Sequence, residues 1–546
     1  MTPRDTDAPL PDDLEAAHRL IRELLATLRV QTHLNDKLQH QLELLLRRIY
    51  GRKSEKIDPA QLLLFAREIL EAGGPALAPA PEPEPPPVSS SSAPKPPGHG
   101  RKPLPATLTR RRVLHDVPLE ERACPDCGGM RTQFGEDVRE QLEYVPASLV
   151  VLQHVRPKYA CKACQAHVVS AARLPEPIAK GLPGPGLLAH VAVSKYADHL
   201  PLYRQERIFE RFGVELSRST MCDWMAACAG LLDPIVQEMF RRVLKSAVVQ
   251  TDDTTVPVQD HAGKGIKTGR LWVHVGDGNN RFIVYDYTSD HSSAGPQRVF
   301  KDFPGYLQAD AYTGYDGLFT SGKIIEVGCW MHARRKFHEA RTSDPAGSHI
   351  ALAWIGELYK IEEDAKKTRK KHPDWDDATW HAHRYELRLR RSRPILDALH
   401  AWLEGVRVLP KSPMSEALGY ALNHWTALMR PLEAGFLEID NGASERALKP
   451  VALGRKNWLF AGSDTGGKTA ATLMSLCATC QEHKIDPFAY LRDVLDRVST
   501  HPQSRIADLL PDRWQPAELP DPPDRPKSID NGQALGGREN SGKQGV

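Results

Sequence analysis

Cysteine is scarce in this sequence, long apolar runs are missing, and neither sign of charge dominates. The nine cysteines are clustered, which favours metal ligation in a reducing cytosol over a disulfide framework. No run of about 18 apolar residues occurs, so no membrane span is expected. The formal net charge is only +3, so any nucleic-acid signal has to be local. The acidic start, MTPRDTDAPLPDD, lacks the apolar core of a secretory signal, which predicts a cytoplasmic protein.

A heptad repeat is the first strong pattern in the chain. Apolar residues recur every seven positions on two seams, which predicts a coiled coil and a homodimer or a higher assembly. Asn35 lies on the first seam, where a buried polar residue typically fixes the register at a cost in stability. The alternative is an amphipathic helix packed on its own domain. The seams are Leu14, Ile21, Leu28, Asn35, Leu42 and Ile49, and Ala17, Leu24, Gln31, Leu38 and Leu45.

Two cysteine pairs carry the strongest metal signal, after a Pro-, Ala- and Ser-rich spacer. The pairs are Cys124-Pro-Asp-Cys127 and Cys161-Lys-Ala-Cys164. Four thiolates complete one closed tetrahedral zinc site, so one structural Zn²⁺ is predicted. The interval between the pairs is longer than in a minimal zinc ribbon, and its strand-like segments indicate a hairpin insertion. Four buried free cysteines are the alternative, and His167 could substitute for one ligand.

Residues 186–232 have the outline of a helix-turn-helix. Gly213 divides two segments of helical periodicity, and Ser217 to Thr220 predicts the N-cap of the second helix. In DNA-binding proteins of this outline the second helix enters the major groove. Plain helical hairpins share the outline without contacting DNA, so both interpretations stay open.

Three acids in separate parts of the chain indicate a nuclease-type site. Asp252 follows the apolar run SAVVQ and Asp310 ends the run YLQA, so both are expected at strand ends. Glu445 lies in a helical setting, which a solvated amphipathic helix would also explain. Two strand-end aspartates followed by a helical glutamate form the Asp-Asp-Glu order of ribonuclease-H-like nucleic-acid enzymes. The candidate phosphate contacts near the glutamate are Arg446, Lys449, Arg455 and Lys456.

Several separated segments resemble one known family. They are TDDT around Asp252, LQADAYTGYDGL around Asp310, VGCWMHARRKF at residues 327–337 and the block IDNGASERALKPVALGRKNWLFAGSDTGG. In this order they closely resemble the bacterial insertion-sequence transposases of the IS sixty-six type, in particular their large TnpC protein. The resemblance extends in pieces over residues 14–510.

The resemblance implies a multidomain α/β protein with a ribonuclease-H-like catalytic core and a helical insertion. It implies that Asp252, Asp310 and Glu445 hold two Mg²⁺ ions, which fits the preference of magnesium for oxygen ligands. The activity would be DNA end cleavage and strand transfer of an insertion sequence. The implied partners are terminal inverted repeats, target DNA and small accessory proteins of the same element, with no membrane and a place at the nucleoid.

Two neighbouring acids could be mistaken for members of the triad. Side chains of adjacent strand residues point to opposite faces, so only one of Asp252 and Asp253 can face the site. The register of TDDT against the family motif places the catalytic aspartate first. Asp440 precedes Asn441 at a helix entry and is expected to cap the helix that carries Glu445.

The expected organisation has eight consecutive parts. They are a coiled-coil dimerisation segment (1–57), a short helix and Pro-rich linker (58–100), a basic segment and zinc-binding module (101–172), a helix-turn-helix-like region (173–235), the first part of the ribonuclease-H-like core (236–330), a helical insertion (331–430), the second part of the core (431–482), and a C-terminal helix and tail (483–546).

Three further motifs have competing interpretations. Residues Gly462 to Thr469 match the Walker A pattern, which gives a P-loop ATPase as an alternative function. Too little sequence follows for the parallel sheet that such a loop needs, so a coincidental match is preferred.

A non-catalytic, zinc-containing DNA-binding regulator is the other alternative function. Two ligand-like pairs lack a second pair and are expected at buried helix positions: Cys329 with His332, and Cys477 with Cys480.

The zinc assignment predicts about one tightly bound zinc per chain. Replacing Cys161 by serine should release this zinc and destabilise the module, because structural zinc binding is coupled to folding. Metal analysis of the purified variant against the wild type measures the loss. Full zinc occupancy in Cys161→Ser would contradict the assignment.

Overall fold

The computed structural model describes residues 13–50, 149, 151, 158–159, 169–170, 176–178, 183–260 and 265–516. Residues 80–172 form a unit of their own, in which β1 (Lys158–Tyr159) and β2 (Val169–Ser170) pair antiparallel. The four candidate zinc ligands, His167 and the predicted hairpin segments fall outside the described residues, apart from positions 149 and 151.

The predicted N-terminal helix is confirmed as α1 (Leu14–Tyr50). Its seam residues Leu14, Ile21, Leu24 and Leu28 are between 51% and 75% exposed in the single chain. An apolar seam left in water is unfavourable, and pairing of this helix in a coiled coil stays a prediction; the side chains of Asn35 and of the later seam residues lie outside the described ones. Among the described residues, no helix is long and apolar enough to cross a membrane.

Three helices follow in the helix-turn-helix-like region: α3 (Pro185–Tyr196), α4 (Leu202–Glu210) and α5 (Arg218–Val243). Ser217 accepts a hydrogen bond from the Thr220 N–H at 3.1 Å, so the predicted N-cap is confirmed. Gly213 has a φ of 72°, which glycine adopts without strain and which lets α4 turn into α5. Thr220 is exposed at the start of α5, whereas Leu232 and Ile235 further along are fully buried.

The centre of the large unit is a five-stranded mixed sheet with the order β5-β4-β3-β6-β7. The strands β3, β4 and β5 are antiparallel neighbours, and β6 and β7 continue the sheet in parallel with β3. Their bounds are β3 (Val248–Asp260), β4 (Gly265–Val275), β5 (Ile283–Thr288), β6 (Tyr306–Gln308) and β7 (Ile325–Val327). Antiparallel pairing of β4 with β5 makes residues 265–288 a hairpin, and the predicted mixed α/β class is confirmed.

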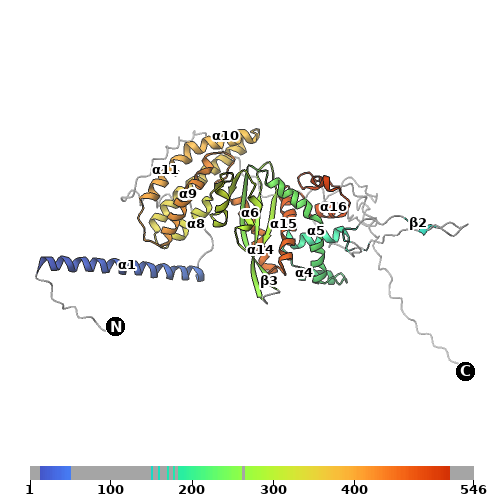
Figure 1. The fold of residues 1–546 in the computed structure, drawn as a ribbon, viewed down its shortest axis with the longest axis horizontal. Helices are drawn as coiled ribbons and strands as arrows, with labels where there is room; N and C mark the ends of the chain where they lie inside the picture. Colours follow the sequence, from blue (N-terminus) through green and yellow to red (C-terminus); the bar gives the residue numbers. More distant parts are fainter. Residues whose placement is uncertain are drawn as a thin grey trace, which may run out of the picture. The chain divides into compact units, whose positions relative to one another are not determined.

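Helices cover this sheet, with α5, α14 (Gly442–Trp458) and α15 (Asp464–Glu482) around its strands (Figure 1). The helix α15 protects the edge strand β5, because Ser475 accepts from the Tyr285 N–H and Thr479 bonds both backbone groups of Ile283. The shorter connections are α6 (Ala294–Phe300), η2 (Thr313–Tyr315) and α7 (Asp316–Phe319), and the later helices are α14 (Gly442–Trp458), α15 (Asp464–Glu482), α16 (Pro487–Arg497) and η5 (Gln503–Leu509).

Between β7 and α14 the chain forms a group of helices with its own apolar core (Figure 1). Edge-to-face contacts such as Trp330 with Trp425 and Trp354 with Trp402 contribute to this core. The elements are α8 (Trp330–Ala340), α9 (Pro345–Lys371), α10 (Asp377–Leu387), the π-helical turn η3 (Arg388–Ser392), α11 (Arg393–Gly405), α12 (Pro413–Asn423), α13 (Trp425–Met429) and η4 (Arg430–Leu432).

Two buried arginines connect this helical group to the segment that leads into α14. Arg384 and Arg388 are 2% and 1% exposed, and both pair with the buried carboxylate of Glu362, at 2.6 and 2.7 Å. Arg384 also pairs with Glu438, at 2.7 Å. Arg388 donates to three backbone carbonyl oxygens within residues 431–437. The segment before α14 is therefore held by charge-assisted bonds that water does not screen.

Replacing Arg388 by methionine should destabilise the protein by about 3–5 kcal/mol, because it leaves the buried Glu362 carboxylate with one cation fewer. Three carbonyl oxygens also lose their donor. Urea unfolding measures the difference. Arg390→Met is the matched control, since Arg390 is exposed on the same turn. Equal unfolding free energies for the two variants would contradict this role of Arg388.

Candidate active site

The sheet and α14 bring together the three acids that the sequence singles out. Asp310 lies two residues after β6, as expected for a strand end, and Glu445 lies in the first turn of α14. Asp252 is different from the prediction, because it lies inside the long strand β3 rather than at its end. Its parallel pairing with β6 stops at Gln250, however, so Asp252 and Asp310 leave the paired region at the same level.

Two glutamines that no sequence motif identified hold these acids in place. Gln250 and Gln308 are register partners on β3 and β6, and each lies two residues before an acid of the triad. Gln250 donates to Gln308 Oε1 at 3.0 Å and accepts from the Ala443 N–H of α14, also at 3.0 Å. Gln308 donates to the Glu438 carbonyl at 2.8 Å. The repeated Gln-x-Asp pattern in VVQTDD and YLQADA was the signal that could have revealed this pair.

Asn441, the N-cap residue of α14, completes the set of buried amides. Its side chain is 0% exposed, accepts from the Cys329 thiol at 3.0 Å and donates to the Thr251 carbonyl at 3.4 Å. A buried amide is costly unless it is hydrogen-bonded, so these contacts specify one position for the start of α14. Glu445 is thereby fixed against the strand that carries Asp252.

The electrostatics of the acids agree with a shared site. Burial raises the pKa of Asp252 to about 7, and repulsion from Asp310 and Glu445 adds to the rise. Burial likewise raises the pKa of Asp310, followed by repulsion from Asp253. Carboxylates that oppose one another's ionisation are stabilised by a cation between them. Their oxygen atoms are the donors that Mg²⁺ prefers, so this donor set fits a hard divalent ion.

Asp253 and Asp440 have partners of their own. Asp253 accepts from Arg270 at 2.8 Å and contacts His291 Nε2 at 3.1 Å, and its side chain is 8% exposed. The His291 ring stacks on Tyr312 with ring centroids 4.0 Å apart. Asp440 accepts from the Gly442 N–H at 2.9 Å, which confirms the expected capping contact at the start of α14. Asp253 is thus held by two side chains and Asp440 by the start of α14, whereas Asp252 accepts from the N–H of its neighbour Asp253 at 2.8 Å.

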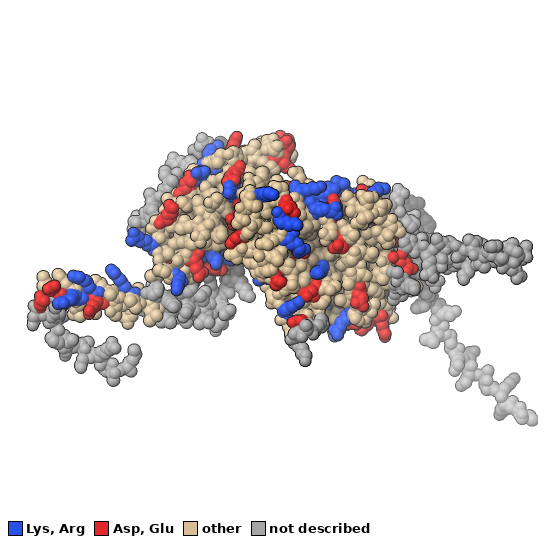
Figure 2. Space-filling view, in the orientation of Figure 1, with Lys and Arg blue, Asp and Glu red and all other residues tan. Residues whose placement is uncertain are grey.

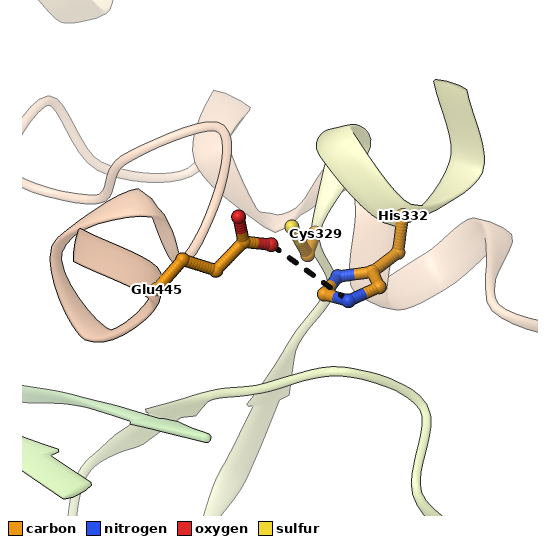
Figure 3. A group of neighbouring side chains, drawn as sticks. All are labelled: Cys329, His332 and Glu445. Atoms are coloured by element: carbon orange, nitrogen blue, oxygen red, sulfur yellow. Dashed lines mark ion pairs between the residues drawn. The ribbon is translucent and has the colours of Figure 1, made fainter. Parts of the chain in front are cut away.

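Cys329 is buried, as predicted, whereas His332 is only partly buried, and both lie beside Glu445. Cys329 is the N-cap residue of α8 and His332 lies in its first turn. Their ligand atoms and a Glu445 oxygen are all within 4.8 Å of one another (Figure 3). Burial raises the pKa of the Cys329 thiol to about 12 and lowers that of His332 to about 4. Sequence spacing found no partner for this pair because the partner comes from a distant helix.

The four candidate phosphate contacts divide into two groups. Arg446, Lys449 and Lys456 are exposed on α14 and are open to a ligand. Arg455 instead bonds the Thr254 hydroxyl at 3.2 Å and the carbonyl and hydroxyl groups of Thr255, so it fastens α14 to β3. On the face shown in Figure 2, lysine and arginine are interspersed with acids, in keeping with the small net charge.

The Walker-like segment has the wrong surroundings for a phosphate cradle. Ser463 caps α15 by accepting from the Gly466 N–H at 3.1 Å. Asp464 is held by Lys267 at 2.7 Å and by the Tyr287 hydroxyl at 2.6 Å. A Cβ on Gly467 would lie 2.5 Å from the Tyr287 ring, so the protein itself fills the space beside the loop. Cys477 and Cys480 further along α15 are buried, as predicted.

Comparison with family models identifies four regions. The Transposase IS66 family matches residues 180–469, and the IS66 C-terminal element matches residues 475–511. The zinc-finger binding domain of transposase IS66 matches residues 121–165, which include all four candidate zinc cysteines. A model described as Transposase C of IS166 homeodomain matches residues 37–113, upstream of the helix-turn-helix-like region of the sequence analysis.

Similar proteins come from Sinorhizobium fredii (strain NBRC 101917 / NGR234). The uncharacterized protein y4hP is 34% identical over 447 residues, covering 76% of this chain and 77% of that protein. The uncharacterized protein y4qI is 32% identical over 553 residues, covering 93% and 98%. Together with the family match over most of the described core, these similarities show that the chain belongs to the IS66 family of transposases.

Proposed function

We propose that this transposase cleaves the ends of its insertion sequence and joins them to target DNA through Asp252, Asp310 and Glu445. The observation that carries the proposal is the convergence of these three acids beside the sheet, where Asp310 and Glu445 add to the raised pKa of the buried Asp252. The order of the strands, three antiparallel followed by two parallel, supports a ribonuclease-H-like core. The same convergence argues against a purely DNA-binding regulator.

The three carboxylates would hold two Mg²⁺ ions. Such ions supply activation of the attacking oxygen and stabilisation of the leaving oxygen in phosphodiester cleavage. Asp252 and Asp310 provide ligands from neighbouring strands, and Glu445 provides one from the facing helix. Since α14 is fixed by Gln250 and Asn441, the spacing of the ligands is set before DNA binds.

Binding of DNA would use residues outside the triad. Arg446, Lys449 and Lys456 are exposed on the helix of Glu445 and can contact backbone phosphates, which would position the scissile strand. Hydrolysis would free a 3′-hydroxyl, which then attacks the target strand. The terminal repeats would be recognised through the zinc module and through the homeodomain-like match at residues 37–113. The region of α4 and α5 is a further candidate contact.

The zinc module and α1 would contribute to the folding of the protein and to its assembly with a second copy. Cys124, Cys127, Cys161 and Cys164 lie within the zinc-finger match and would bind one structural Zn²⁺. The exposed seam of α1 would pair with the same helix of a second copy, because synapsis of two DNA ends requires at least two recognition units. Small accessory proteins of the same element are further expected partners.

The triad makes a direct prediction about magnesium-dependent cleavage of the element's ends. Asp252→Asn, Asp310→Asn and Glu445→Gln should each abolish cleavage, because each removes an anionic ligand at nearly constant shape. Cleavage of a labelled DNA fragment that carries one end of the element is the measurement. DNA binding and thermal unfolding of the same variants should stay close to wild type.

Three matched controls accompany this assay. Asp253→Asn should retain measurable cleavage, and Asp440→Ala should lose only about 0.5–2 kcal/mol of stability, as for a helix cap. Lys468→Ala should cleave within a few-fold of wild type, because the Walker-like loop has no phosphate cradle. An active Glu445→Gln, or a dead Asp253→Asn beside an active Asp252→Asn, would overturn the triad. ATP-dependent cleavage abolished by Lys468→Ala would restore the ATPase alternative.

A further inference from the structure

The cluster of Cys329, His332 and Glu445 has donor atoms that the proposed magnesium chemistry does not require. His332 Nε2 and Glu445 Oε1 are 3.8 Å apart, and the three ligand atoms lie within 4.8 Å of one another. In Figure 3 the three side chains point toward a common centre from α14 and from the start of α8. A tetrahedral ion with bonds of about 2.0–2.3 Å separates its ligands by roughly 3.3–3.8 Å, so small side-chain shifts suffice.

The chemistry of the three donors selects the kind of ion. Sulfur and imidazole ligands suit Zn²⁺ and similar transition metals, whereas Mg²⁺ takes oxygen ligands. A thiolate and a carboxylate together neutralise a divalent charge, which suits a cluster in which Cys329 is 0% exposed. The His332 ring also has an unused nitrogen, because its buried Nδ1 has no hydrogen-bond partner among the described residues.

We propose that Cys329, His332 and Glu445 form a second zinc site, with three protein ligands and one open position. On binding, the Cys329 thiol releases its proton to solvent and ends its hydrogen bond to Asn441, since a coordinating thiol is deprotonated. Arg335 lies 3.9 Å from the same Glu445 oxygen. Its side chain is 44% exposed, so it can turn into solvent when the ion enters.

This site shares Glu445 with the proposed triad, so its effect on catalysis depends on the proposed function. A carboxylate drawn toward sulfur and imidazole is displaced from the two aspartates. Zinc bound at this cluster would then inhibit magnesium-dependent cleavage, and a cell rich in free zinc would hold the transposase inactive. Zinc binding itself does not depend on the catalytic proposal.

The test measures zinc on the full-length chain, without reference to activity. The protein is washed with a mild chelator that leaves the tightly bound zinc, then dialysed against zinc chloride and passed through a desalting column. Wild type should gain about one equivalent of zinc over the washed state, and Cys329→Ser should gain none. Cys222→Ser is the matched control, because Cys222 is an exposed thiol on α5 and its variant should gain the full equivalent.

A second variant covers the case in which Cys329→Ser does not fold. His332→Gln removes a ligand at a less buried position and should also gain no zinc, with thermal unfolding close to wild type. Cobalt offers an independent readout, since a thiolate ligand adds a charge-transfer band that both variants should lack relative to Cys222→Ser. Equal zinc uptake by wild type, Cys329→Ser and His332→Gln would overturn the proposal.

Cleavage assays separate this inference from the proposed function. In wild type, added zinc should reduce magnesium-dependent cleavage in proportion to occupancy of the second site, whereas His332→Gln should resist this inhibition. If wild type shows no cleavage at all, the triad proposal fails while the zinc uptake still decides the site. If cleavage is normal and neither variant changes zinc uptake, the site fails and the triad stands.

Discussion

Three buried side-chain amides hold the ends of separate chain segments in one arrangement, and the acid cluster depends on them. Gln250, Gln308 and Asn441 connect β3, β6 and the start of α14 through hydrogen bonds that water cannot replace. Leaving one such amide unpaired would cost about 1–3 kcal/mol, so alternative registers are disfavoured. Because side chains two residues apart on a strand share a face, fixing the glutamines also fixes the direction of Asp252.

The helical group between β7 and α14 supports the same arrangement from the other side. Its buried arginines Arg384 and Arg388 hold residues 431–438, and the Glu438 carbonyl at the end of that segment accepts from Gln308. Glu438 is therefore bonded both by the buried arginine Arg384 and by the buried amide of Gln308. The inserted helices thereby help to set where α14 begins, in addition to enclosing a core of their own.

Local patterns in the sequence predicted much of this fold. The helix α1, the Ser217 cap and the helical setting of Glu445 follow from periodicity and from the residues at the helix start. The sequence also identified the three acids as candidates, although Asp252 lies within its strand and not at its end. Periodicity could not reveal contacts between distant segments, such as Cys329 with Glu445, because their pairing is decided by packing. The internal role of Arg455 was missed for the same reason. The sequence around an arginine does not differ between a side chain that contacts DNA and one that bonds to β3.

The placement of the inserted helices has a consequence for the protein while it is being made. Asp252 and Asp310 leave the ribosome first, and the whole helical group follows before Glu445 is synthesised. Since Arg388 of that group holds the segment that leads into α14, the position of the third acid depends on the inserted helices. A chain truncated before Glu445 therefore contains the first two acids of the proposed triad without the third. Under the proposed function, DNA cleavage would therefore require that the chain has been synthesised at least to the end of α14.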